Sequence, residues 1–280
     1  MSNNNKNKSD INREIEKAIT SKDCELVKKL ITAVGNKNHA LHIACQNNEL
    51  EIVEYCVSIG ADVKFKDSQS MIWAAKEGFL DIVKFLVSKG ADVKAKNYEA
   101  LCMAVSNGHL DTVKYLISQG SCVVKSKAIV WTPDRYRSGL DMLEYLISLG
   151  ADVTVDDNLT IKHAARFCNA AFIKCLVDNG ADINVSDSSL IEEALYEGNL
   201  EAVGYLLSIG ADITKISKEY SDELIEYLYN NHEFDKVEEL INIFGCSIDE
   251  IKVSMKKIIQ RRNKFYDRCN FCKDIVIIFE

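Results

Sequence analysis

Apolar residues recur along the chain as short stripes that repeat every thirty residues. Leu80, Val83, Leu86 and Val87 have the i, i+3, i+6, i+7 spacing of one face of an amphipathic helix. Leucine returns at the same step, at Leu86, Leu116, Leu146, Leu176 and Leu206. A small residue keeps the same phase, at Ala44, Ala74, Ala104, Ala164 and Ala194. Several columns in phase predict a chain built from repeated units.

Each unit is predicted to hold two short helices. In one unit the first runs over about 70–77 and stops at Gly78, and the second runs over about 80–88 and closes at Gly90. A Gly-Ala-Asp triplet marks the turn between units at 60–62, 90–92, 150–152, 180–182 and 210–212. Neither helix can bury its stripe alone, so neighbouring units must stack. We therefore predict an all-α fold, a solenoid of helix-turn-helix units.

The repeated segments resemble the ankyrin repeat family. His39-Ala40-Leu41-His42-Ile43-Ala44-Cys45 is similar to its T-P-L-H-x-A-A signature, and Gly108-His109-Leu110 to its G-H-L. The resemblance implies an ankyrin-repeat solenoid that is not an enzyme and binds a partner protein on its concave face. The usual period is 33, so units of thirty imply shortened β-turn fingers. The Lys/Asn/Ile-rich, proline-poor repeats also resemble those of giant viruses that infect amoebae, which implies the host cytoplasm and a host partner.

The pattern divides the chain into five segments. We expect a disordered polar N-terminus at 1–10, a capping repeat at 11–35, repeats of period thirty at 36–214, a degenerate repeat with C-terminal capping helices at 215–264, and an unassigned tail at 265–280. Apolar positions of the capping repeat are Ile15, Ala18, Ile19, Leu26, Val27, Leu30 and Ile31.

The unit at 121–150 is expected to be distorted. Pro133 lies inside its predicted first helix, where proline removes a hydrogen bond and clashes with the preceding turn. We therefore predict that the helix begins later in the sequence, with Thr132 as its N-cap and Pro133 at its first position, where proline costs little free energy. This leaves an expected loop over 122–131.

Candidate chemistry is sparse. The sequence has no nucleotide-binding glycine loop and no H-E-x-x-H, so we predict no catalytic, cofactor or metal site. Cys269 and Cys272 form a C-x-x-C that could bind zinc or act as a redox pair, but zinc would need two further ligands. The ten cysteines are otherwise scattered, and the polar first residues are not a secretory signal. We interpret the cysteines as reduced thiols of a cytoplasmic, monomeric protein. No apolar run in the sequence is long enough for a membrane span.

The charge is unevenly distributed. The formal net charge of -8 argues against nucleic acid as a partner. Residues 252–273 nevertheless hold eight basic residues against Asp267. This segment could be a solvated helix end, or it could meet an acidic partner, RNA or an anionic surface. The apolar residues 274–279 could pack on the last helices or act as a docking peptide. An adaptor is therefore the alternative function: the repeats select a target, and the basic helices recruit a second complex such as a ubiquitin ligase.

The resemblance also indicates which residues would contact a partner. Variable positions after the second small residue of each first helix point into the groove in this family. The resulting protein-binding candidates are Lys76, Glu77, Tyr136, Arg137, Arg166, Phe167, Tyr196 and Glu197. Gln46, Asn47, Ser106 and Asn107 hold the same positions, and Phe65, Lys66, Tyr98 and Glu99 extend the surface from the turns. An exposed Phe167 is the sharpest indication, although Phe167 and Tyr196 could instead tuck between units.

Overall fold

The structure is a computed structural model that describes residues 2–132, 139–185, 189–231 and 236. The chain forms two compact units, Met1–Asp182 and Ile183–Glu280. The described residues are all helix, turn or irregular chain, with no strand among them. The shortened fingers expected between units therefore contain no β-hairpin in this part of the chain.

The first unit is a series of paired short helices. Its elements are α1 (Ser2–Thr20), α2 (Cys24–Val34), α3 (Lys37–Gln46), α4 (Leu50–Ser58), α5 (Phe65–Lys76), α6 (Leu80–Ser88), α7 (Ala95–Ser106), α8 (Leu110–Ser118), α9 (Val123–Ser126), the 3-10 helix η1 (Ala128–Trp131), α10 (Gly139–Ser148), α11 (Val155–Phe167) and α12 (Ala170–Asp178). Helix α6 has the bounds that its apolar stripe predicted.

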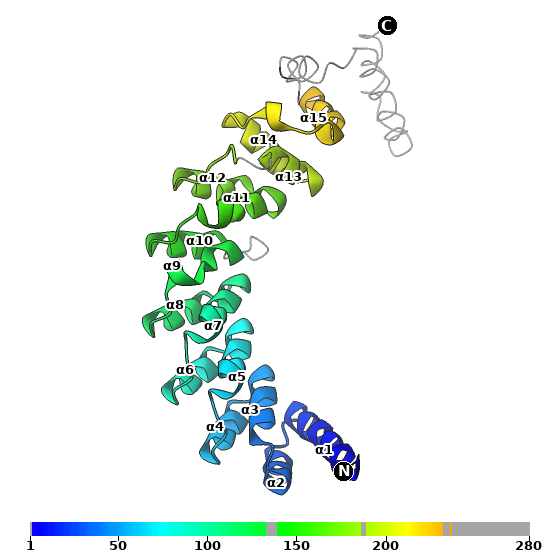
Figure 1. Ribbon diagram of the computed structural model, residues 1–280, viewed down its shortest axis with the longest axis vertical. Coiled ribbons are helices and arrows are strands. Elements are labelled where there is room, and N and C mark those ends of the chain that lie inside the picture. The colour runs from blue at the N-terminus through cyan, green and yellow to red at the C-terminus, as the bar shows by residue number, and fades with distance from the viewer. Residues whose placement is uncertain (1, 133–138, 186–188, 232–235, 237–280) are drawn as a thin grey trace. The chain divides into compact units, whose positions relative to one another are not determined.

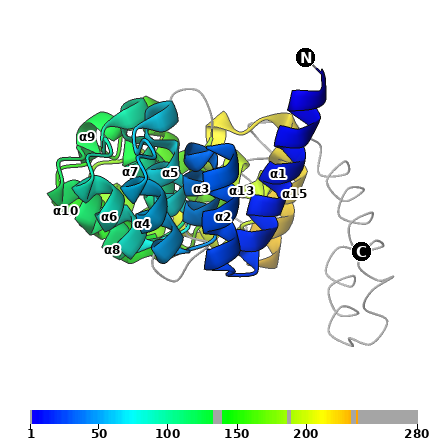
Figure 2. The same ribbon diagram turned by 90° about the horizontal axis from the view of Figure 1, so that it is seen from below.

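The helices of this unit lie in two rows (Figures 1 and 2). The first helix of each pair contacts the first helix of the next, as in α1–α3, α3–α5 and α5–α7. The second helices do the same in α2–α4, α4–α6 and α6–α8. Ala44, Ala74, Ala104 and Ala164 are completely buried, because only a methyl group fits where the helices approach. The core is thus a continuous seam that each unit shares with its neighbours.

The turns between units are held by an aspartate. Asp62 Oδ1 accepts the Lys64 amide at 2.9 Å, and Asp92 does the same for Lys94. Asp152 Oδ1 accepts both the amide and the hydroxyl of Thr154, and these bonds lower the pKa of the Asp152 carboxyl. This local bonding explains the aspartate of the Gly-Ala-Asp column.

At three of the turns, a single side chain of one unit also bonds the backbone of the next. Asn38 Oδ1 accepts the amide of Asp62 at 2.8 Å, and Ser68 Oγ accepts that of Asp92 at 3.0 Å. Asn158 does the same for Asp182 at 3.1 Å. Each bond spans 24 residues in sequence and ties one unit to its neighbour.

The start of α5, α7 and α11 is not regular helix. Three consecutive residues have positive φ in each, for example Lys66 (49°), Asp67 (56°) and Ser68 (60°). The same left-handed turn covers 96–98 in α7 and 156–158 in α11. This turn carries Tyr98 inward, where it is 9% exposed. The expectation that Tyr98 extends the binding surface is therefore wrong.

The N-terminus differs from its prediction. Residues 1–10 were expected to be disordered, but α1 begins at Ser2. No glycine or proline interrupts residues 2–20, so the helix anchored by Ile15, Ala18 and Ile19 continues through the polar residues before it. In α2, Val27 and Ile31 are buried as predicted, whereas Leu26 lies at the surface.

The unit at 121–150 departs from its neighbours. The expected loop over 122–131 is instead two short helical turns, α9 and η1, joined at Lys127 with φ 51°. Ala128 and Ile129 are buried there, while Trp131 is 51% exposed. The predicted helix start at Pro133 lies outside the described residues.

The second unit contains α13 (Leu190–Tyr196), α14 (Leu200–Ser208), the 3-10 helix η2 (Ile213–Lys215) and α15 (Lys218–Asn230). Leu224 and Leu228 of α15 are completely buried. A Cβ at Gly204 would lie 2.4 Å from the Tyr227 hydroxyl, so glycine permits the close approach of α14 and α15. The helices expected at 234–262 and the tail at 265–280 lie outside the described residues, Lys236 aside.

Candidate functional site

The candidate surface is the C-terminal end of the first helices. In the first unit, Lys76 is the last residue of α5 and Glu77 caps it. Lys76 Nζ lies 4.4 Å from the ring centroid of Trp73 and 3.7 Å from Glu77 Oε1. These contacts orient the lysine along the helix end, so Lys76, Glu77 and Trp73 form one polar and aromatic cluster.

A histidine of the following unit fixes this helix end. His109 Nε2 donates to the Lys76 carbonyl at 2.9 Å, since a carbonyl oxygen can only accept. Gly78, at φ 74°, leaves the space that the imidazole occupies. His109 therefore has a structural role, because it joins the end of α5 to the unit that follows.

The second part of the surface is the end of α11. Phe167 is the last residue of this helix, and its side chain is 48% exposed. Cys168 stands where three other units have Gly78, Gly108 and Gly198, adopts an extended backbone, and is buried at 5% exposure. Asn169 then caps α12 by accepting the Phe172 amide at 2.9 Å. The buried cysteine and the capped helix hold Phe167, with Arg166 beside it in sequence, at the surface.

The second unit places Tyr196 and Glu197 in the corresponding position at the end of α13. The side chain of Tyr196 is 65% exposed. Neither Tyr196 nor Phe167 is buried, so the alternative in which they tuck between units does not hold. Tyr136 and Arg137 lie outside the described residues.

Two of the lesser candidates serve the fold instead. Asn47 Nδ2 donates to the Ile43 carbonyl at 2.8 Å, and Asn107 Nδ2 donates to the Met103 carbonyl at 2.9 Å. Both amides thus satisfy carbonyls at the end of their own helix. Phe65, by contrast, is 42% exposed at the start of α5.

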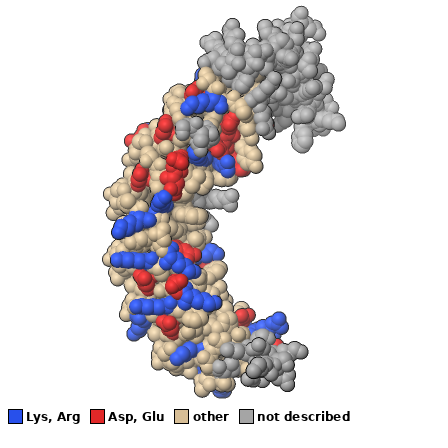
Figure 3. All heavy atoms as spheres, in the orientation of Figure 1, with Lys and Arg blue, Asp and Glu red and all other residues tan. Residues whose placement is uncertain are grey.

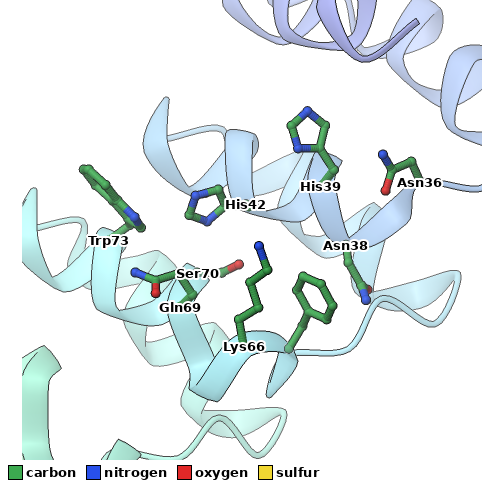
Figure 4. Close-up of a pocket in the computed structure, with 9 residues that line it drawn as sticks. Asn36, Asn38, His39, His42, Lys66, Gln69, Ser70 and Trp73 are labelled. Atoms are coloured by element: carbon green, nitrogen blue, oxygen red, sulfur yellow. The ribbon is translucent and has the colours of Figure 1, made fainter. Parts of the chain in front are cut away.

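A hollow between α3 and α5 was not predicted (Figure 4). Its volume is about 560 Å³, and its lining residues are Asn36, Asn38, His39, His42, Phe65, Lys66, Gln69, Ser70 and Trp73. The rings of His42 and Trp73 meet edge to face with centroids 6.1 Å apart. The individual residues were visible in the sequence, but their convergence depends on how consecutive units stack.

Cationic groups dominate this hollow. Burial lowers the pKa of His42, and the positive charges of His39 and Lys66 lower it further. On the side of α1, His39 Nε2 lies 3.4 Å from Glu16 Oε1. His42 is consequently neutral at neutral pH, and Lys66 supplies the permanent charge.

The described residues offer little for covalent or metal chemistry. No group of three or more His, Cys, Asp or Glu side chains within them could hold a metal ion. Burial raises the pKa of Cys56 to about 12 and that of Cys102 to about 11, so neither thiol is a reactive thiolate at neutral pH. The C-x-x-C of Cys269 and Cys272 lies outside this part of the chain.

A sequence-family model described as ankyrin repeats in three copies matches residues 15–97, 69–128 and 135–217. These matches cover more than half of the chain. The chain belongs to the ankyrin repeat family. Ankyrin repeats mediate protein–protein interactions, and the fold generally serves as a non-enzymatic scaffold. No curated protein sequence matches the chain significantly.

Solved structures show the same fold. The human ASB11 ankyrin repeat domain is 20% identical with a TM-score of 0.58, over 71% of this chain and 98% of that one. A chain from the complex of the predatory endopeptidase Bd0816 of Bdellovibrio bacteriovorus with the immunity protein Bd3460 is 22% identical. Its TM-score is 0.50, over 60% of this chain and 96% of that one. Among the described helices of this ankyrin-repeat chain, none is long and apolar enough to cross a membrane.

Proposed function

We propose that this ankyrin-repeat chain holds a partner protein against the ends of its first helices. The observation that supports this most is the exposure of a large aromatic side chain, Phe167, at the end of α11. Tyr196 has the corresponding position in the second unit. Aromatic side chains and arginine dominate the hot spots of protein–protein interfaces, because they bury a large area at a small entropic cost.

The surface charge fits a protein partner better than a nucleic acid. Basic and acidic side chains are interspersed over the visible face of the first unit (Figure 3). Contact with the phosphates of a nucleic acid requires a positively charged face. The mixed pattern therefore favours a protein partner, which is recognised by its shape and its local charges. Because α5 and α11 are held by neighbouring units, the surface is formed before binding and little ordering is required.

The test uses two matched variants. Phe167→Ala removes the exposed aromatic ring, and Leu149→Ala removes an apolar side chain of similar exposure, 41%, that follows α10 in the row of second helices. The partner is first captured with the native chain in its own cell, and its dissociation constant is then measured for each variant. We expect Phe167→Ala to weaken binding at least tenfold and Leu149→Ala to leave it unchanged. Equal effects of the two variants would refute the assignment of this surface.

The adaptor alternative depends on residues 246–280, which lie outside the described residues. Removing them would release a recruited second complex while the target stays bound. A host partner, a cytoplasmic location and the likeness to giant-virus repeats are parts of the same proposal.

A further inference from the structure

Lys66 forms no ion pair with an acidic side chain of the described residues. Its Nζ lies 5.6 Å from the ring centroid of Phe65. Lys96, thirty residues later, occupies the same position in the next unit. Its Nζ is 2.7 Å from Gln69 Oε1 and 3.5 Å from Glu99 Oε2. The two lysines therefore differ in their partners: the unit of Lys96 supplies a carboxylate, and the unit of Lys66 does not.

The difference arises from three substitutions between consecutive units. Gln69 of α5 corresponds to Glu99 of α7, so the acid that pairs with Lys96 is replaced by a neutral amide near Lys66. Phe65 corresponds to Ala95, and Trp73 to Met103. The α3–α5 junction thus gains two aromatic walls and loses the carboxylate.

The resulting hollow carries one ammonium, two imidazoles and three side-chain amides, of which Asn36 already donates to Asn12 Oδ1 at 2.8 Å. Lys66, the two imidazoles and the side-chain amides of Asn36, Asn38 and Gln69 line it, and no carboxylate does (Figure 4). Asp67 follows Lys66 in the turn but makes no ion pair with it. Lys66 is the one permanent charge, which matches a single carboxylate better than a dianionic phosphate. The rings of Phe65 and Trp73 add an apolar contact next to it.

We propose that this hollow binds an aspartate or glutamate side chain of a partner protein, together with an apolar side chain adjacent to it. This inference rests on the proposed function, because it adds a charged contact to the same row of first helices. It names the chemistry of the partner segment: acidic and apolar residues in alternation.

Binding should strengthen as the pH falls. A carboxylate next to His42 favours the imidazolium, which in the free protein is opposed by burial and by the charges of His39 and Lys66. Three further charges lie around the hollow: Lys76 is held on Trp73 of α5, Glu16 of α1 lies against His39, and Lys96 of α7 is bonded to Gln69 and paired with Glu99. Occupation therefore raises the pKa of His42 and takes up a proton, so affinity rises as the pH falls through the bound-state pKa of His42 and levels off below its free-state pKa.

The experiment uses tryptophan fluorescence. The chain has two tryptophans, so Trp131→Phe leaves Trp73 as the reporter in the wall of the hollow. The probe is a short blocked peptide of alternating leucine and glutamate, and the comparison peptides replace glutamate with lysine or phosphoserine. We expect the glutamate peptide to bind, and Lys66→Met to weaken its binding about tenfold, as for the loss of one charge-assisted contact. Lys84→Met, at an exposed lysine of α6 in the row of second helices, is the control and should leave binding unchanged.

Three results would overturn the inference: equal binding by Lys66→Met and Lys84→Met, equal binding of the lysine peptide, or tighter binding of the phosphoserine peptide than of the glutamate peptide. Each would leave the proposed function standing, because that is tested by Phe167→Ala against the whole partner. Conversely, an unaltered partner affinity in Phe167→Ala would reject the proposed surface and leave the peptide result unaffected.

Discussion

Replacing Gly78 with alanine tests how rigidly consecutive units are joined. The new Cβ would lie 2.4 Å from His109 Nδ1, which is closer than real Cβ atoms come. The imidazole cannot move away without losing the 2.9 Å bond to the Lys76 carbonyl. Position 78 also has φ 74°, which costs a non-glycine residue about 1–2 kcal/mol.

The cost of the positive φ and the cost of the clash with His109 can be separated by comparing two glycines. Gly198 has nearly the same conformation, φ 71°, but no atom lies within 4 Å of its added Cβ. Gly198→Ala should therefore cost only the backbone term, about 1–2 kcal/mol. Gly78→Ala adds the disturbed hydrogen bond, about 0.5–1.5 kcal/mol, for a total of about 1.5–3.5 kcal/mol.

Urea unfolding followed by far-UV circular dichroism would measure both free energies of unfolding. Hydrogen exchange of the α5 and α8 amides would report whether the loss is local. A double-mutant cycle with His109→Ala separates the clash from the backbone term, because the clash disappears once the imidazole is gone. Our account would be wrong if Gly78→Ala cost no more than Gly198→Ala, or if Gly78→Ala and His109→Ala were additive.

Two further predictions concern single side chains. Asn169→Ala removes the acceptor for the Phe172 amide and should lower the free energy of unfolding by about 1 kcal/mol. Asn179→Ala, at the other end of α12, should lower it by less. The urea midpoints of the two variants test this difference. His42 should titrate by NMR below the ordinary histidine pKa of about 6.5, and Lys66→Met should raise its pKa. Because the folded-state pKa is the lower one, the unfolded chain binds more protons as pH falls through 6.5, so this histidine destabilises the fold at acidic pH; a His42 pKa at or above the ordinary value would contradict this.

Much of the fold follows from columns of residues that repeat in phase. The stripe of Leu80, Val83, Leu86 and Val87 predicted the bounds of α6 because one face of a helix at constant spacing must be buried. The surface positions of Phe167 and Tyr196 follow in the same way, since their place in the repeat sets their place in the fold. Their role in binding remains a prediction.

The features that sequence reasoning missed depend on contacts between units. Nothing in the periodicity indicates that three residues at the start of α5 and α7 turn left-handed, and this turn is what buries Tyr98. The hollow next to Lys66 has a similar origin. It lacks a carboxylate because Gln69 stands where the next unit has Glu99, so a comparison of consecutive units, rather than a search for a motif, is the signal that could have found it.

The side-chain bond between successive turns has a consequence for the coupling between units. Asn38, Ser68 and Asn158 each fasten one unit to the next, whereas the same position holds Tyr98 and then Ala128, which make no such bond. In a linear array, cooperativity is transmitted only through nearest-neighbour interfaces. At these two junctions the coupling passes through other contacts, a 3.3 Å bond from Ser121 Oγ to the Val93 carbonyl and an ion pair between Lys127 and Asp156. Because this ion pair is exposed, salt screens it, so added salt should loosen the junction between Lys127 and α11 while the links made by Asn38, Ser68 and Asn158 remain.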